Sequence, residues 1–426
     1  MQAILEDERS RYLLVDVLVA RQAILDRRLR VHGYELAFRV DSERAAEGCA
    51  LTPWANGAEV TPDAFARDVA DLCSQTNAFV RFDRSMLLGQ WYKRLSPRAI
   101  VIEVPASVSL DREALAMCQM AFEQGYRIAL DDYVGSPDPE SLFAIANLIK
   151  VRAPDTRRSA QSELIQSCHA RGLKVLATNV DDTAKFEWAR SMGYDYFQGG
   201  FLVHPNELHG RQIETMKANY LRLLEETQRP SLDFGRLQML ICEDLALVYK
   251  LTRYASSALF SRRSPIRSVQ QALVTLGEQN VRRWAALVLF TSIAADKPGE
   301  LITCSLVRGR FCETLSKTVR PQIQHQAFLT GLFSLLDALV DRPMKVILRE
   351  LDLVSPITSA LLNTAPEHDM LAGVYRLACH YERAEWQGVD RLLERFRISP
   401  TLARWAYGEA LKWSHQVVTG IRRERA

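Results

Sequence analysis

Arg127-Ile128-Ala129-Leu130-Asp131-Asp132-Tyr133-Val134 is the stretch from which the fold of this chain can be inferred. Its first half, Arg127–Leu130, predicts a β-strand, and two adjacent acids follow where that strand ends. Paired carboxylates at the carboxyl end of a strand suit hard cations such as Mg²⁺. The stretch therefore indicates an enzyme-like scaffold with a metal site at one edge of a sheet.

The same pattern recurs over the first 205 residues, where short β-rich runs alternate with amphipathic segments. The expected strands are Leu13–Val19, Tyr34–Val40, Phe79–Phe82, Ile100–Val104, Arg127–Asp131, Leu148–Val151, Lys174–Ala177 and Tyr196–Val203. The expected helices between them are Pro62–Cys73, Asp111–Gly125, Pro139–Asn147, Arg158–Arg171 and Asp181–Met192. About eight strands alternating with helices predict a closed α/β barrel of the TIM type, with a doubly wound open sheet as the alternative.

Beyond Pro205 the pattern becomes helical. A helix is expected over Glu207–Gln228, ended by Pro230, and no convincing period-two strand follows it. The chain is therefore expected to join an α/β part to an all-α part. The expected boundaries are a barrel at residues 1–206, a connector helix at 207–230 and a helical domain at 231–426.

Composition excludes several classes of protein. A net charge of +3 in 426 residues gives no basis for a nucleic-acid or membrane surface. The N-terminus is acidic and has no apolar signal core, and no apolar run is long enough to span a bilayer. The eight cysteines form no CxxC pair, which favours buried free thiols in a reducing compartment. We expect a cytoplasmic protein that inserts into no membrane and binds no nucleic acid.

The residues able to carry chemistry recur at the ends of the expected strands. They are Glu35, Glu103, Asp131, Asp132, Lys150 and Gln198. In a parallel barrel the carboxyl ends of the strands meet on one face, where active sites lie. Singly, Glu35 could be a satisfied polar residue at the rim and Lys150 a surface cation. Their shared location favours a functional site.

These residues lie in segments that resemble the EAL domain, a bacterial barrel that hydrolyses cyclic dimeric GMP. The matching segments are Arg21–Ile24, Gly33–Arg39 with its Glu-Leu-Ala sequence, Ile102–Val104, Asp131–Tyr133, Ile149–Val151 and Gln198–Phe201. The resemblance puts Glu35 at a metal-ligand position. It also implies that Gln22, Arg39 and Gln198 contact the nucleotide; the residues leave open whether Arg39 instead pairs with a barrel acid.

The chain departs from the family pattern at metal-site positions. Arg81 occupies the position where the family has a metal-binding asparagine. Arg152 occupies the position where the family has an aspartate. Thr178 replaces a glutamate, and the later glutamate is shortened to Asp181. An extra cation about 4 Å from a metal costs about 4 kcal/mol per unit charge at an effective dielectric of 20. Two-metal catalysis is therefore not expected.

This reasoning predicts a protein that is not an enzyme and carries no metal or other cofactor. The acids, together with Lys150 and Asp181, would be vestiges, and Arg81 and Arg152 would pair with them in place of the metals. The barrel would act in signalling by binding cyclic di-GMP, a protein, or both. The alternative is a weakly active, metal-dependent cyclic di-GMP phosphodiesterase in which an arginine turns out to solvent.

The helical half resembles the HDOD domain, a non-catalytic relative of the HD phosphohydrolases. The resemblance rests on Ile241–Leu245, Ile266–Leu273, Arg282–Trp284 and Ala327–Asp337. Its His-Asp dipeptide, His368-Asp369, lies in a loop-like context and is read as a surface pair. The resemblance implies that this domain binds a protein partner and that the protein acts in motility or biofilm control. A homodimer is also possible under this resemblance.

Overall fold

The computed structural model describes residues 17–40, 69, 72–73, 76–105, 112–133, 142–153, 158–203, 218–256, 266, 268–294, 297–351 and 353–425. The chain divides into two compact units. The barrel unit comprises Met1–His204, Pro298–Glu300 and Cys379–Ala426, and the helical unit comprises Pro205–Lys297 and Leu301–Ala378.

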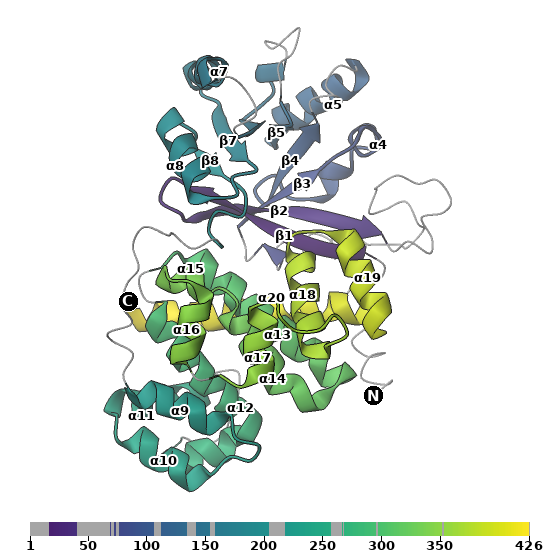
Figure 1. Cartoon of the computed structure of the whole chain (residues 1–426). Coiled ribbons are helices and arrows are strands. Elements are labelled where there is room, and N and C mark those ends of the chain that lie inside the picture. Colours follow the sequence, from purple (N-terminus) through teal and green to yellow (C-terminus); the bar gives the residue numbers. More distant parts are fainter. Residues whose placement is uncertain are drawn as a thin grey trace. The chain divides into compact units, whose positions relative to one another are not determined.

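The barrel unit contains a closed barrel whose strands follow one another in sequence order (Figure 1). The strands are β1 (Val17–Asp26), β2 (Val31–Val40), β3 (Asn77–Arg81), β4 (Ile100–Pro105), β5 (Arg127–Asp131), β6 (Leu148–Arg152), β7 (Lys174–Thr178) and β8 (Tyr196–Phe197). Neighbours from β2 to β8 are parallel, so their carboxyl ends share one rim. The predicted TIM-like barrel is confirmed.

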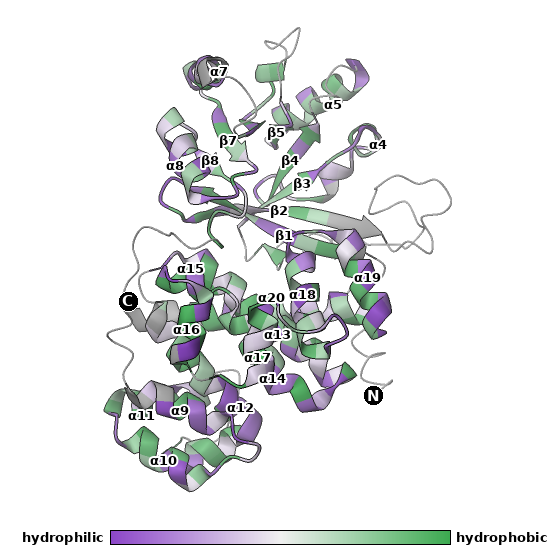
Figure 2. Cartoon of the chain, in the orientation of Figure 1, coloured by the Kyte–Doolittle hydropathy of each residue, from purple (hydrophilic) through white to green (hydrophobic). Residues whose placement is uncertain are grey.

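Helices surround the barrel and bury its strands. They are α4 (Arg84–Leu88), the 3-10 helix η1 (Trp91–Arg94), α5 (Arg112–Glu123), α7 (Arg158–Ala170) and α8 (Thr183–Met192). All but the last residue of β4 are buried, and Figure 2 shows this strand as mainly hydrophobic. Strands covered on both faces read as continuous apolar runs, which is why the parallel strands could be found from the sequence.

The first strand lies later than predicted, at Val17–Asp26, and runs antiparallel to β2 and β8. The turn between β1 and β2 is held by Asp26, whose Oδ1 accepts from the backbone N–H groups of Arg28 and Arg30 at 2.8 and 2.9 Å. Leu29 adopts a positive φ of 59° within this turn. The charged residues around the turn hid the hairpin in the sequence.

The outer face of this hairpin carries a buried charged group. The Arg21 guanidinium lies 4.1 Å from the centre of the Tyr34 ring, and the Tyr34 hydroxyl donates to Glu300 Oε2 at 2.7 Å. Both Arg21 and Glu300 are buried. The pKa of Arg21 is raised: burial opposes the rise, whereas Tyr34 and Glu300 favour it.

The C-terminal helices α19 (Trp386–Phe396) and α20 (Pro400–Arg425) belong to the barrel unit, and α20 contacts β1. The sequence had placed all of residues 231–426 in the helical domain. The structure groups Cys379–Ala426 with the barrel unit, and α20, whose Ala403, Ala406 and Ala410 are buried, contacts β1. A helical pattern alone does not reveal which core a helix joins.

The remaining helices form or enter the helical unit. They are α9 (Ala218–Thr227), α10 (Phe234–Cys242), α11 (Leu245–Ala255), α12 (Val269–Ile293), α13 (Gly299–Val319), η4 (Pro321–Ile323), α14 (Gln324–Phe333), α15 (Leu336–Val340), α16 (Met344–Glu350), α17 (Ser355–Leu361) and α18 (Met370–Glu382). The expected connector helix is described only from Ala218 onward. None of the described helices combines the length and apolar character that a bilayer crossing requires.

A glycine allows α13 and α14 to approach closely. A Cβ added at Gly331 would lie 2.5 Å from the carbonyl carbon and oxygen of Arg308. At Gly408 in α20, by contrast, an added Cβ meets nothing within 4 Å. The two positions therefore form a matched pair of helical glycines.

We expect Gly331→Ala to lower stability by about 1–3 kcal/mol, because the added methyl group overpacks the contact. Gly408→Ala should leave stability unchanged or raise it by up to about 1 kcal/mol, because alanine favours helix. Denaturant unfolding of both variants measures the difference. Equal effects would contradict the close approach of the two helices.

Candidate functional site

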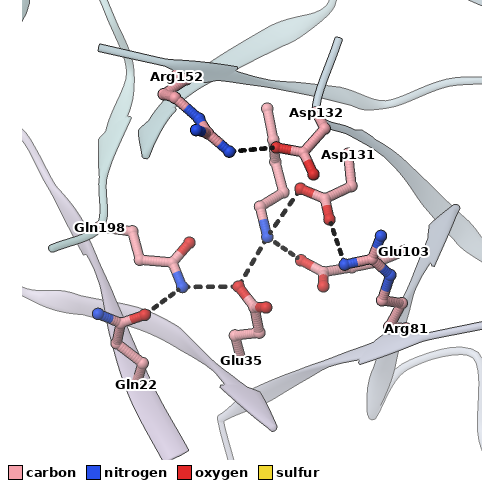
Figure 3. Close-up of polar contacts among 9 residues, drawn as sticks. Gln22, Glu35, Arg81, Glu103, Asp131, Asp132, Arg152 and Gln198 are labelled. Carbon is pink, nitrogen blue, oxygen red and sulfur yellow. Dashed lines mark hydrogen bonds and ion pairs between the residues drawn. The ribbon is translucent and has the colours of Figure 1, made fainter. Parts of the chain in front are cut away.

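The interior of the barrel has an apolar layer next to a charged layer. The apolar layer consists of Ile24, Phe79, Val101, Ala129, Leu148 and Leu176. Side chains two residues apart on a strand point to the same side. Arg81, Glu103, Asp131 and Lys150 therefore form the next layer toward the carboxyl rim. Figure 3 shows the side chains of Arg81, Glu103 and Asp131 converging.

The Lys150 ammonium group lies close to three acids of this rim layer. Lys150 Nζ donates to Glu35 Oε2 and to Glu103 Oε1, both at 2.7 Å, and lies 3.5 Å from Asp131 Oδ1. The Lys150 and Glu103 side chains are 2% and 0% exposed. Three carboxylates from three strands thus share one buried cation.

The three ionisable partners have strongly shifted pKa values. Burial opposes the charge on Lys150, but Glu103, Glu35 and Asp131 raise the pKa of its ammonium group above the ordinary value. Burial likewise opposes ionisation of Glu35, yet the Lys150 ammonium holds the pKa of Glu35 below its ordinary value. Burial, with repulsion from Glu35, raises the pKa of Glu103 to about 8.

Two glutamines orient the outer part of the rim layer. Gln198 Nε2 donates to Glu35 Oε2 at 2.6 Å and to Gln22 Oε1 at 2.9 Å. The backbone beyond Gln198 runs so close to Val180 that a Cβ on Gly199 would lie 2.1 Å from the Val180 carbonyl oxygen. Gly199 therefore allows Gln198 to enter the site, and the predicted neighbours Gln22, Glu35 and Gln198 are together.

The two arginines pair with the adjacent acids, as predicted. Arg81 Nη1 lies 3.4 Å from Asp131 Oδ2, and Arg152 Nη2 lies 3.6 Å from Asp132 Oδ1. Asp132 has a positive φ of 51°, so a left-handed residue follows β5 at the rim. Whether these arginines displace metal ions stays a prediction.

The arginines do not fill the site, which differs from the sequence-based reasoning. Each arginine side chain is 54% exposed, so its pair contributes about 0–1 kcal/mol and not the about 3–5 kcal/mol of a buried pair. Lys150 supplies the buried cation instead. Its depth in the barrel could not be read from the sequence.

Three other predicted positions contribute less to this centre. Thr178 ends β7, paired in register with Arg152. Asp181 is exposed and pairs with Lys185 at 3.4 Å, away from the shared cation. The side chain of Arg39 lies outside the described residues.

The donor set of the rim layer fits one divalent cation. Glu35, Glu103 and Asp131 present carboxylate oxygens, the ligands that Mg²⁺ and Mn²⁺ prefer. Glu103 Oε2 is buried and has no hydrogen-bond partner among the described residues. In the part of the chain that the structure describes, no three His, Cys, Asp or Glu side chains are yet arranged as a metal site, because these carboxylates gather around Lys150. A second cation would meet Arg81 and Arg152, which do not fit it.

The His-Asp dipeptide of the helical unit has a structural role. Asp369 Oδ1 accepts from the backbone N–H of Ala372 at 2.8 Å, at the start of α18. An aspartate that accepts in this way caps a helix N-terminus. His368 and Asp369 thus provide no sign of an HD-type metal centre among the residues that can be described.

A parallel barrel with an acidic rim, joined to a helical unit, defines the class of this protein. Residues 82–205 match the family model of the EAL domain, and residues 213–340 match that of the HDOD domain. The chain is therefore similar to EAL domains over residues 82–205 and to HDOD domains over residues 213–340. The EAL match begins after the segment that holds Glu35.

Two relatives extend over nearly the whole chain. One is the "Uncharacterized protein YuxH" of Bacillus subtilis, 28% identical over 416 residues that cover 94% of this chain and 99% of the relative. The other is the "Cyclic di-GMP phosphodiesterase CdgJ" of Vibrio cholerae, 28% identical over 402 residues that cover 94% and 92%.

Solved structures align with only part of the chain. BlrP1 from Klebsiella pneumoniae, in a calcium and cyclic di-GMP complex, is 21% identical, with a TM-score of 0.36 over 44% of this chain and 55% of its own. The FimX EAL domain from Pseudomonas aeruginosa, bound to cyclic di-GMP, is 19% identical, with a TM-score of 0.36 over 47% and 94%. This chain thus spans about half of BlrP1.

The prediction that the chain is not an enzyme is wrong. A relative matched over 94% of the chain is named a phosphodiesterase, and residues 82–205 match the EAL model. The prediction gave Arg81 and Arg152 the weight of buried charges, whereas both extend over half of their surface into solvent. The cation that lies among the acids is Lys150. It belongs to Ile149–Val151, a segment that resembles the EAL family pattern.

We expect Glu103→Gln to reduce the pH dependence of stability. Because burial raises the pKa of Glu103 to about 8 in the folded state, the folded protein binds the extra proton between pH 4.5 and 8. Stability should fall as the pH rises through this window, by up to about 1.4 kcal/mol per pH unit. Chemical unfolding at several pH values measures this slope in the wild type and in Glu103→Gln, with the exposed Glu163→Gln as control. Identical slopes would contradict the assignment.

We also expect Lys150→Met to show that the buried ammonium group stabilises the fold and that it occupies the place of a metal ion among the acids. Removal of the ammonium group leaves Glu35, Glu103 and Asp131 without their shared cation and should cost about 3–5 kcal/mol. Mn²⁺ should then raise the melting temperature of the variant more than that of the wild type. Lys174→Met, at a lysine 54% exposed, is the control. A variant as stable as the wild type and indifferent to Mn²⁺ would contradict the prediction.

Proposed function

We propose that this chain is a signalling protein whose barrel binds cyclic di-GMP and hydrolyses it as a metal-dependent phosphodiesterase. The observation that carries the proposal is the convergence of Glu35, Glu103 and Asp131 on one cation at the carboxyl rim. Active sites of such barrels lie at this rim. The relative named a cyclic di-GMP phosphodiesterase supports the choice of substrate.

Glu35, Glu103 and Asp131 would hold the divalent cation. When bound, such an ion supplies positive charge that activates water and stabilises charge on a phosphodiester. Gln198 fixes the orientation of Glu35 through its 2.6 Å hydrogen bond. Lys150 remains protonated and keeps Glu35 and Glu103 directed toward one point.

Glu103 is suited to hold a proton near neutral pH. Burial raises its pKa to about 8, and within the part of the chain that the structure describes its Oε2 atom has no hydrogen-bond partner. A group whose pKa lies near the working pH changes its protonation state at little cost. Deprotonation of Glu103 would accompany metal binding, so we infer that metal affinity rises with pH.

Several finer expectations are part of the proposal. The helical domain would bind a protein partner, with a homodimer as one arrangement, and the signalling would control motility or biofilm formation in the cytoplasm. These assignments rest on the resemblance to EAL and HDOD proteins. The domain boundaries at residues 206 and 230 are proposed on the same basis.

The test is formation of linear dinucleotide from cyclic di-GMP with saturating Mn²⁺ or Mg²⁺, followed by chromatography. We expect metal-dependent product, and a loss of at least about 100-fold in Glu35→Gln, since the lost charge stabilisation amounts to several kcal/mol. Glu163→Gln on the exposed face of α7 should retain full activity. No product from the folded wild type at saturating metal would overturn the proposal.

A further inference from the structure

Two guanidinium groups lie at the rim beside the shared cation, and the metal chemistry leaves them without a role. Arg81 ends β3 and Arg152 occupies the last position of β6, on either side of Asp131 and Asp132 (Figure 3). Each side chain is 54% exposed. Both groups are therefore accessible to a ligand that enters the rim.

The ion pairs of these arginines are weak. Their distances of 3.4 and 3.6 Å exceed the about 2.7–2.9 Å of a charge-assisted hydrogen bond. An exposed pair of this kind contributes at most about 1 kcal/mol. A guanidinium group binds phosphate oxygens through two parallel hydrogen bonds. If an arginine exchanged its aspartate partner for a phosphate group, the lost ion pair would therefore cost little free energy, and the new hydrogen bonds would have better geometry.

The charge balance of the rim depends on the arginines. The acids Glu35, Glu103, Asp131 and Asp132 face the cations Lys150, Arg81 and Arg152. Without the arginines the rim would be negative and would repel the two phosphodiester groups of a cyclic dinucleotide.

We propose that Arg81 and Arg152 form an anion-binding pair that takes the phosphodiester groups of the nucleotide, exchanging their pairs with Asp131 and Asp132 for bonds to phosphate oxygens. The inference rests on the proposed function, because it assigns the residues that bind the same substrate. It differs from metal binding in one respect: the fixed guanidinium charges remain when divalent ions are removed. Nucleotide binding should therefore persist without metal.

The experiment is calorimetric titration of the full chain with cyclic di-GMP in EDTA, at several salt concentrations. We expect the wild type to bind, and Arg81→Gln and Arg152→Gln each to lose about 10-fold or more in affinity, with a weaker salt dependence. Arg81→Lys should recover part of the loss, since it restores charge but not two parallel bonds. Arg30→Gln is the matched control, because Arg30 is an exposed arginine in the turn at the opposite end of the barrel.

The outcomes separate this inference from the proposed function. If Mn²⁺-dependent hydrolysis is present but the arginine variants bind as tightly as Arg30→Gln, the anion-binding pair is wrong and the phosphodiesterase stands. Loss of all wild-type binding in EDTA would overturn the pair in the same way. If the wild type neither binds nor hydrolyses the nucleotide, both fail. Melting curves of each variant establish that the folded protein was measured.

Discussion

The ammonium group of Lys150 is the interaction on which the barrel rim depends. At an effective dielectric of 20, two carboxylates about 4 Å apart repel by about 4 kcal/mol, so three of them in one buried layer need a cation. Lys150 meets this need from within the chain, at 2.7 Å from both Glu35 and Glu103. The barrel can therefore fold with its acids assembled before any ligand arrives.

The parallel strands of the barrel were predictable because they are buried on both faces. Ile100–Val104 and Arg127–Asp131 are mainly apolar, and each carries an acid at or next to its end, Glu103 and Asp131. This pattern predicted both the strands and the rim. The first strand was misplaced because its hairpin partner is set by a charged turn at Asp26, and charged residues indicate a loop as readily as a turn.

The sequence located residues whose side chains the structure brings together at the rim, but it did not reveal the energetics of their charges. Glu35, Glu103, Asp131, Lys150 and Gln198 were all found at strand ends, since period-two geometry directs them to one interior layer. The sequence gives the sign of a charged side chain but not the fraction of it that is exposed to solvent. Lys150 at 2% exposed and Arg81 at 54% exposed carry the same charge with very different consequences.

The C-terminal segment gives the barrel an unusual order of assembly. The hairpin of β1 and β2 is synthesised well before Glu300, and Glu300 is synthesised before α20, which contacts β1. At ~5–20 residues per second, roughly 20–80 s separate the synthesis of the hairpin from the completion of α20. During that interval Arg21 and Tyr34 lack their final partners. A nascent chain interrupted before α20 would thus expose the outer face of β1 to chaperones and proteases.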